Sequence, residues 1–212
     1  MAQQLVAGLI GDMIRSRDAR DRGELQQRMT EVLDHVDSVV GGDPVFTIGD
    51  EFQATFPTVE SAIEASVQLH LRSIGLTRLR IGIGWGELLI DDPGRSPFGQ
   101  DGPCWWRARE AIEFVDRSTR RRGPEVRTAF RSESTMDPAL NSYLMLRDTL
   151  LAGFDEVDSR IAIGLIEGLS QTEIASRVGI NKSSINRRAH RHGILALVEA
   201  RDLGSLAIGR LS

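Results

Sequence analysis

Two aspartates stand where short β-prone segments end, and such positions can bring carboxylates together. Asp12 follows the apolar run Leu5–Ile10, and Asp50 lies in a predicted hairpin between two further β-prone runs. If the strands are neighbours, both carboxylates can bind one Mg²⁺ or Mn²⁺ ion, as in many sites for nucleotide phosphates. We therefore predict a metal site at Asp12 and Asp50.

Two arginines follow the first aspartate closely. Arg15 and Arg17 would lie at the mouth of the predicted metal site, where guanidinium groups suit phosphate oxygens. They could equally pair with Asp50 or Glu51 in a purely structural network. The sequence leaves both interpretations open, and Arg15 and Arg17 are candidate nucleotide-binding residues.

The second candidate site is a basic segment near the C-terminus. Residues 171–192 contain five Lys or Arg and one acid, although the whole chain has a formal net charge of −4. A local positive surface on an acidic chain is typical of nucleic-acid binding.

The basic segment is predicted to form two short helices, over 170–178 and 181–192. Ser170 and Glu173 have the spacing of a capping box, and Gly179 permits the left-handed turn that ends a helix. Apolar residues at helical spacing give an inward face, formed by Ile174, Ala175, Val178, Ile180, Ile185 and Ala189. The pattern resembles the helix-turn-helix of simple regulators and of sigma-factor region-four units.

The outward side of these helices carries hydroxyl, amide and guanidinium groups, which are the usual contacts to bases and phosphates. A helix N-terminus also favours anions, because its first N–H groups are free. The candidate DNA-binding residues are Ser170, Gln171, Thr172, Lys182, Ser183, Ser184, Asn186, Arg187 and Arg191. The alternative is a helical hairpin whose arginine-rich face is simply solvated.

The rest of the sequence must supply the elements that position these residues. Apolar periodicity and turn residues predict strands at 5–10, 77–90 (one strand or a pair) and 126–131, a hairpin around Gly49 and Asp50, a polar loop at 91–101, and helices at 25–39, 58–74, 103–119, 137–153 and 155–168. We predict an α/β (α+β) domain over residues 1–135 and an all-α domain over residues 136–212.

Composition limits the class of protein. The chain has 212 residues, of which 41% are hydrophobic, and its single cysteine, Cys104, excludes an intrachain disulfide. The apolar runs are too short to cross a membrane, and the first residues lack the basic region of a signal peptide. We therefore expect a cytoplasmic protein with no membrane contact. Trp105 and Trp106 cannot share one core from a regular helix, so we expect one in the core and one at an interface.

Four segments, in this order, resemble the ferredoxin-like palm domain of class III nucleotidyl cyclases: LIGDMI, VFTIGDEFQATFP, LRIGIGWGELL and GQDGPCWWRAREAI. The GDEF stretch also resembles the hairpin of diguanylate cyclases. The resemblance implies that Asp12 and Asp50 are the metal aspartates. The family's purine, ribose and transition-state positions fall instead on Phe46, Gly99, Trp106 and Glu110, and the nearby arginines that could bind nucleotide are Arg107 and Arg109.

The chain is also similar to the SatD family over nearly its whole length. Members of that family begin with G-D-x-I-x-S-R, carry a G-D-x-F-Q hairpin and a D-G-P-x-x-W-x-A-R-E-A helix, and end in a helix-turn-helix. The matching stretches in this chain are residues 11–17, 49–53 and 101–111. This resemblance supports the architecture more than it defines a mechanism.

These features together predict a DNA-binding transcriptional regulator. Its palm domain would bind a nucleotide or cyclic nucleotide, with Mg²⁺ or Mn²⁺, or mediate homodimerisation, because helix-turn-helix units normally pair across two half-sites. The alternative is a divergent metal-dependent nucleotidyl cyclase or transferase with an accessory DNA-binding domain. The changed ribose and transition-state positions make cyclase activity the less expected function, since phosphoryl transfer depends on positioning and charge neutralisation.

Overall fold

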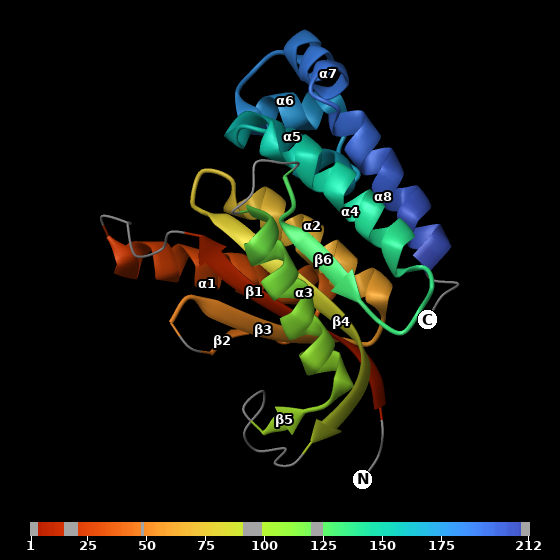
Figure 1. The fold of residues 1–212 in the computed structure, drawn as a ribbon. Helices are drawn as coiled ribbons and strands as arrows, with labels where there is room; N and C mark the ends of the chain where they lie inside the picture. Colours follow the sequence, from red (N-terminus) through yellow and green to blue (C-terminus); the bar gives the residue numbers. More distant parts are fainter. Residues whose placement is uncertain (1–3, 15–20, 48, 91–98, 120–124, 209–212) are drawn as a thin grey trace.

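A mixed sheet flanked by helices forms the first part of the chain, and a group of helices forms the rest (Figure 1). The computed structural model describes residues 4–14, 21–47, 49–90, 99–119 and 125–208. The strands are β1 (Gln4–Ile14), β2 (Val45–Phe46), β3 (Glu51–Phe56), β4 (Arg78–Ile90), β5 (Gln100–Asp101) and β6 (Thr128–Arg131). The helices are α1 (Arg22–Val40), α2 (Val59–Ser73), α3 (Pro103–Thr119), α4 (Asp137–Ala152), α5 (Glu156–Ile166), α6 (Gln171–Val178), α7 (Lys182–Arg191) and α8 (Ile194–Ile208).

The central strand of the sheet is β1, which pairs antiparallel with β3 on one side and β4 on the other. Strand β2 continues the sheet beyond β3, and β6 runs parallel to β4. The predicted mixed α/β fold is therefore confirmed. Residues 78–90 form one continuous strand, and β5 pairs with its far end inside the segment that we predict to be a loop.

The two faces of the sheet carry different helices because side chains alternate along each strand. Ala7 and Leu9 of β1 join the core beneath α1 and α2, whereas Val6 and Ile10 join a smaller cluster beneath α3. Figure 1 shows α3 crossing one face, with α1 and α2 on the other. Of the two adjacent tryptophans, Trp105 is 8% exposed in the α3 cluster and Trp106 is 60% exposed, as expected from their spacing on a helix.

Helix α3 lies unusually close to β4 because β4 presents glycines to it. A Cβ at Gly82 would lie 2.3 Å from the carbonyl oxygen of Ala108, and one at Gly84 would lie 2.2 Å from the backbone nitrogen of Ala108. Both separations are far below van der Waals contact. Glycine at these two positions therefore sets how closely α3 can approach the sheet.

A buried polar network joins α4 to β6 and α2. Asp148 accepts hydrogen bonds from the backbone N–H groups of Arg127 (2.8 Å) and Thr128 (2.6 Å), and from the guanidinium of Arg147 (2.9 Å). Arg147 also donates to the hydroxyl of Thr128 at 2.6 Å, and His70 Nε2 lies 2.8 Å from the same hydroxyl. Burial lowers the pKa of His70 to about 3, so its ring is neutral at physiological pH.

The C-terminal helices share a second apolar cluster with the sheet part of the molecule. Val67 and Leu71 of α2 pack in the same cluster as Ile161 of α5, Ile185 of α7 and Leu197 of α8. Helix α2 therefore packs against both the sheet core and the C-terminal helices. None of the described helices combines the length and apolarity that a membrane span requires.

Candidate functional site

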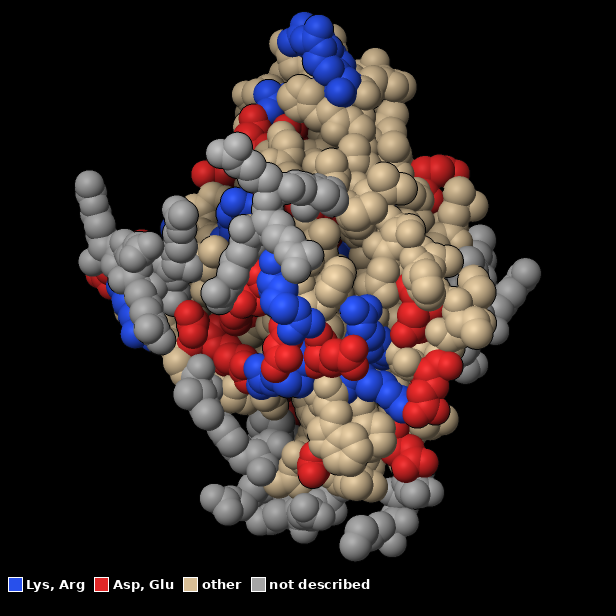
Figure 2. All heavy atoms as spheres, viewed as in Figure 1, with Lys and Arg blue, Asp and Glu red and all other residues tan. Residues whose placement is uncertain are grey.

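The first candidate site lies at one end of the central strands, on the α3 face. In the sheet register, Asp12 of β1 stands opposite Glu51 of β3 and opposite Arg80 of β4. Helix α3 adds Arg109 and Asp116 from above. We call Asp12, Asp50, Glu51, Arg80, Arg109 and Asp116 the strand-end cluster. Figure 2 shows acidic and basic groups side by side across the middle of this face.

The carboxylate of Asp12 is bound by a guanidinium group, that of Arg80. Arg80 Nε donates to Asp12 Oδ1 at 2.8 Å, and Arg80 Nη1 forms an ion pair with Asp116. The three side chains are between 21% and 31% exposed. Arg80 therefore supplies the positive charge between two carboxylates that come from different elements.

The carboxylate of Glu51 is bound by a second guanidinium group, that of Arg109. Arg109 donates to both carboxylate oxygens of Glu51, at 2.7 and 2.8 Å. A two-bond contact of this kind fixes the orientation of both groups as well as their distance. The predicted nucleotide-binding residue Arg109 therefore reaches the strand end, and it does so as the partner of an acid.

The pKa values of Asp12 and Glu51, the two acids paired with arginines, shift in opposite directions. Burial raises the pKa of Asp12 above its ordinary value, and the charge of Asp50 adds to that shift, while Arg80 opposes it without cancelling it. Burial also acts to raise the pKa of Glu51, but the bonds and charge of Arg109 outweigh it, so that pKa is lowered. Asp50 lies at the β2–β3 turn, where its backbone carbonyl accepts the N–H of Met13 at 3.3 Å.

The strand-end cluster, as it stands, does not fit a bound divalent metal. The Met13 N–H donates to the backbone carbonyl of Asp50 at 3.3 Å, which places Asp50 beside β1. A Mg²⁺ ion requires near-octahedral oxygen ligands, and the Asp12 carboxylate is held by Arg80. Within the described ranges, no group of three or more His, Cys, Asp or Glu is arranged to hold a metal ion. A metal would have to displace Arg80 from Asp12.

The other predicted nucleotide-binding arginines do not join the cluster in the described part of the chain. Arg107 donates to the backbone carbonyl of Trp85 at 2.7 Å and forms an ion pair with Glu133. Arg15 and Arg17 lie outside the described residues.

The positions that depart from the cyclase pattern have local partners of their own. Trp106 Nε1 donates to Asp101 at 2.8 Å, and Glu110 pairs with Arg131 at 3.4 Å. Phe46 packs edge-on against Phe52, with ring centroids 6.1 Å apart. These residues therefore serve local packing and pairing in this structure.

Sequence reasoning missed Arg80 and Asp116. The alternation of β4 carries a signal for Arg80, because it shares a face with Gly82 and Gly84 and so must point toward α3. Asp116 lies seven residues after Arg109, two turns along the same helix face. These patterns could have placed both residues on one side, although they do not identify their partners.

The second candidate site is formed by α6 and α7. Ser170 and Glu173 form the predicted capping box, in which the Ser170 N–H donates to the Glu173 carboxylate at 2.8 Å and the Glu173 N–H donates to the Ser170 hydroxyl at 3.3 Å. Gly179 ends α6 in the left-handed conformation with φ of 78°. Asn181 then begins α7 by accepting the N–H of Ser184 at 2.8 Å. The two helices therefore end and begin where the sequence predicts.

Helix α7 is fixed in rotation by one basic residue and by its apolar face. Ile185 and Ala189 are buried, and Arg188 donates to Asp158 at 2.8 Å and pairs with Asp155, both at the start of α5. His192 Nδ1 lies 2.8 Å from the other oxygen of Asp158. These contacts determine which side of α7 faces solvent.

The solvent side of α7 carries most of the predicted DNA-binding residues. Lys182, Ser183, Asn186, Arg187 and Arg191 are exposed, and Ser184 is half-buried. On α6 and its cap, Ser170 and Thr172 are exposed and Gln171 is half-buried.

The Lys and Arg side chains on the solvent side of α7 have no acidic partner among the described residues, unlike most other described arginines. Among residues that the structure describes, Lys182, Arg187 and Arg191 form no ion pair, although Arg187 donates to the hydroxyl of Ser184 at 3.3 Å. Basic atoms gather over α7 at the top of Figure 2. Its positive charge is therefore available to a partner.

Comparison with known proteins places the chain in a family. The sequence pattern of the SatD family matches residues 6–205, so the chain belongs to the SatD family. A comparison with the curated proteins finds no match.

Solved structures similar to the chain include nucleotidyl cyclase domains. A bacterial light-regulated adenylyl cyclase is 18% identical, with a TM-score of 0.48 over 61% of this chain and 77% of that chain. An adenylate/guanylate cyclase/hydrolase from Silicibacter pomeroyi is 23% identical, with a TM-score of 0.42 over 54% of this chain and 72% of that one. Because these TM-scores lie below 0.5, the similarity does not establish a common function.

Proposed function

We propose that this chain is a DNA-binding transcriptional regulator, in which α6 and α7 form a helix-turn-helix. The observation that carries the proposal is the exposed side of α7, where Lys182, Arg187 and Arg191 have no acidic partner among the described residues. Most arginines elsewhere in the described chain are paired with acids, whereas three cations without an acidic partner share the solvent side of α7.

The side chains of α7 suit the two kinds of contact that DNA offers. Ser183, Asn186 and Arg187 would contact base edges in the major groove, since hydroxyl, amide and guanidinium groups match the donor and acceptor pattern there. Lys182, Ser184 and Arg191 would contact phosphates. Ser170, Gln171 and Thr172 would do the same from the cap and first turn of α6, where the capping box leaves the N–H groups of Gln171 and Thr172 to meet an anion.

The proposal also assigns a role to the sheet domain. We infer that the palm-like part, residues 1–135, forms a homodimer or senses a ligand, and that residues 136–212 carry the DNA-binding helices. A dimer presents two α7 helices to two half-sites, which a single helix-turn-helix does not. The proposal places the working protein in the cytoplasm.

A second candidate function is a metal-dependent nucleotidyl cyclase or transferase, or a nucleotide sensor built on the same site. The hydrogen bond from the Met13 N–H to the backbone carbonyl of Asp50, next to Asp12 on β1, supports it. The pairs Arg80–Asp12 and Arg109–Glu51 oppose it, because the carboxylates of Asp12 and Glu51 already have arginine partners. It requires Mg²⁺ or Mn²⁺ with a nucleotide to displace Arg80, and so ranks below DNA binding.

The proposed function is tested by measuring affinity for double-stranded DNA by fluorescence anisotropy across a series of salt concentrations. The wild-type chain is expected to bind with a strong salt dependence. The double variant Arg187→Ala/Arg191→Ala should lose roughly tenfold in affinity or more, since one arginine contact to a base is worth about 1–3 kcal/mol. Its salt slope should fall by about one for each phosphate contact removed.

The matched control is Arg117→Ala, because Arg117 is also an exposed arginine but lies on α3. It should bind DNA as the wild type does. Equal losses in the control and the double variant, or no salt-dependent binding by the wild type, would contradict the proposal.

The second candidate is tested by thermal stability with nucleoside triphosphates and cyclic nucleotides, with and without Mg²⁺ or Mn²⁺. A ligand at a hundred times its Kd stabilises by about 2.7 kcal/mol. A metal-dependent shift that Asp12→Asn abolishes would support the nucleotide site. The same panel without any shift would remove these ligands from consideration.

A further inference from the structure

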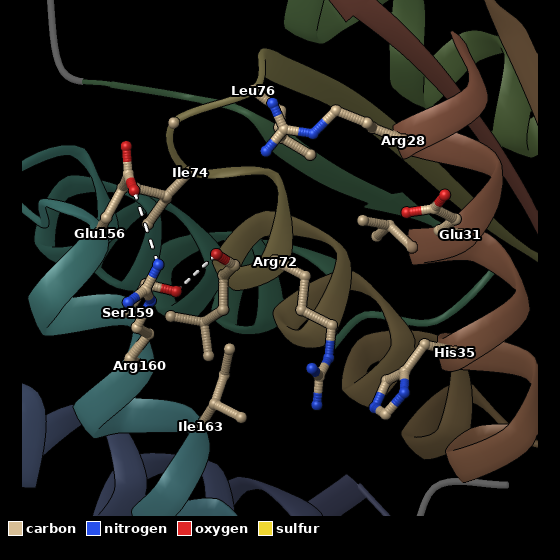
Figure 3. Close-up of a pocket in the computed structure, with 13 residues that line it drawn as sticks. Arg28, Glu31, His35, Arg72, Ile74, Leu76, Glu156, Ser159, Arg160 and Ile163 are labelled. Carbon is tan, nitrogen blue, oxygen red and sulfur yellow. Dashed lines mark hydrogen bonds and ion pairs between the residues drawn. The ribbon is translucent and has the colours of Figure 1, made fainter. Parts of the chain in front are cut away.

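A groove lies where α1, the end of α2 and α5 meet (Figure 3). Its volume is about 340 Å³, within the range of sites for small organic ligands. Arg28 and His35 come from α1, Arg72 from α2, and Ser159 and Arg160 from α5. The groove is therefore built jointly by α1 and α2, which pack on the sheet, and by α5 of the C-terminal helices.

The groove carries more cationic groups than acidic ones. Arg28, Arg72 and Arg160 line it against Glu31 and Glu156, and Arg72 is also paired with Glu167. Arg28 has no hydrogen bond or ion pair among the described residues, and Arg160 reaches Glu156 only at 3.9 Å. The positive charge of the groove is thus only partly neutralised from within the protein.

Arg72 gives the groove a well-fixed guanidinium. Its side chain is 18% exposed, and it is held by Gln68 and Glu167, each at 3.2 Å. A guanidinium held in this way is already oriented, so less conformational entropy is lost when it binds an anion.

Apolar side chains form the remaining wall of the groove. Ile74 and Leu76, after the end of α2, and Ile163 of α5 line it between the charged groups. Ligand sites commonly combine such a surface with a few placed polar groups, where the apolar part binds the body of the ligand and the polar part orients it. The groove therefore suits an organic molecule better than a bare ion.

We propose that this groove binds a small phosphorylated organic molecule. The phosphate would lie among Arg28, Arg72 and Arg160, because guanidinium groups match phosphate oxygens in charge and in geometry. The organic part would lie against Ile74, Leu76 and Ile163. This site is separate from the strand-end cluster, which lies on the opposite face of the sheet beneath α3.

The same turn of α5 that lines the groove also holds α7. Ser159 donates to the backbone carbonyl of Leu71 at 2.6 Å, which ties α5 to the end of α2. Asp155 and Asp158, immediately beside Glu156 and Ser159, hold Arg188 of α7. A ligand in the groove would therefore act on α7 through one helical turn. This regulatory consequence rests on the proposed DNA-binding function, whereas the site itself does not.

The site is tested with the full chain by isothermal titration calorimetry, using phenyl phosphate and inorganic phosphate as probes. We expect saturable binding of both, with phenyl phosphate tighter because its ring buries apolar surface. The double variant Arg28→Gln/Arg160→Gln should bind phenyl phosphate roughly tenfold more weakly. Both substituted residues are exposed, so their replacement should leave the fold intact.

The control is Arg117→Gln, which removes an exposed arginine from α3 and none from the groove. It should bind phenyl phosphate as the wild type does. The proposal is overturned if neither probe binds saturably, if phenyl phosphate binds no tighter than phosphate, or if the control loses as much affinity as the groove variant.

The regulatory consequence is measured separately, as the affinity for DNA with and without saturating phenyl phosphate. A coupling of about fivefold or more in either direction is expected for linked sites. If DNA binding is absent while phenyl phosphate binds in the groove, the proposed function fails and the site stands. If DNA binds and the groove does not take the probe, the reverse holds.

Discussion

The arginines of the strand-end cluster and those of α7 have the same chemistry and opposite situations. Arg80 and Arg109 are each held between or against carboxylates, whereas Arg187 and Arg191 face solvent without an acidic partner among the described residues. The charge of the first pair is offset by neighbouring carboxylates, and the charge of the second pair is not. A basic residue therefore adds net positive charge to a surface only when the fold leaves it without an acidic partner.

The contrast extends to the interior. Arg147 is 2% exposed, and each nitrogen of its guanidinium donates a hydrogen bond, to Asp148, Thr128 or Ser66. It is the most buried member of the paired class, so its pairing should matter most for stability. The predictions that follow test how far each class depends on its partners.

The largest effect is expected for Asp148→Ala, which leaves the Arg147 guanidinium buried without a counter-charge. Breaking a buried ion pair by removing one partner costs about 3–5 kcal/mol. Urea denaturation should show this loss in the free energy of unfolding. The control is Asp202→Ala, which removes the exposed partner of Arg201 and should cost less than about 1 kcal/mol. Similar values for the two variants would contradict the stabilising role of the buried network.

Within α7, Arg188→Ala should mainly reduce stability, and Arg191→Ala should mainly reduce DNA binding. Arg188→Ala removes a partner of Asp158, whose side chain is 1% exposed, and should lower the free energy of unfolding by about 1–3 kcal/mol. Arg191→Ala should change stability by less than about 0.5 kcal/mol and should weaken DNA binding. Urea denaturation and anisotropy on both variants check this. A stability loss at Arg191 equal to that at Arg188 would show that the solvent face is structural.

At the strand-end cluster, Arg80→Gln should expose a metal preference that Arg80 suppresses. Removing the guanidinium should cost roughly 1 kcal/mol, since the groups are partly exposed and solvent screens them. It also leaves Asp12 and Asp116 without that counter-charge beside Asp50. Millimolar Mg²⁺ should then raise the melting temperature of the variant, as expected for binding to the folded state.

The wild type provides the comparison for this metal experiment. Its melting temperature should respond to Mg²⁺ less than that of Arg80→Gln. Equal responses would show that Arg80 does not compete with a metal for Asp12. A larger response in the wild type would favour the metal-dependent second function.

The smallest effect concerns the pH dependence of the Glu51–Arg109 pair. Because the pKa of Glu51 is lowered in the folded state, the pair stabilises the fold at neutral pH. That contribution should disappear as the pH falls below the ordinary range of a glutamate and through the lowered pKa. The difference in unfolding free energy between wild type and Glu51→Gln should shrink over that interval.

Asp12→Asn is the contrasting variant for the pH measurement. The pKa of Asp12 is raised in the folded state, so its ionised form is disfavoured there. Stability in the wild type is then reduced as the pH rises through the ordinary aspartate range and up to the raised value. Asp12→Asn should therefore lose less stability at neutral pH than Glu51→Gln. A larger loss would contradict a raised pKa at Asp12 and a lowered pKa at Glu51.

The sequence predicts the elements well where the signal is local. Ser170, Glu173 and Gly179 mark the ends of α6 because caps and turns depend on residues within one helical turn. For α8 the sequence indicates only a helical region, since its bounds carry no comparable cap. Which residues face one another is less accessible, because it depends on contacts between distant parts of the chain.

The arginine–acid pairs of the strand-end cluster show why such contacts are hard to predict from sequence. Arg80 is 68 residues from Asp12, and only the strand register brings them together. Arg107 and Arg109 are two residues apart on α3, so they point to nearly opposite sides of the helix, and only Arg109 reaches Glu51. The sequence can propose both arginines, but the rotation of α3 decides between them.

The glycines beneath α3 bear on how this chain can diverge. At Gly82 and Gly84 even one methyl group would collide with the backbone of α3, so almost every substitution there would push the helix off the sheet. The outward positions of α3 meet no such limit. Across lineages, the seat of the helix should therefore stay fixed while the side chains that it presents to solvent vary, so that one scaffold could serve several ligands.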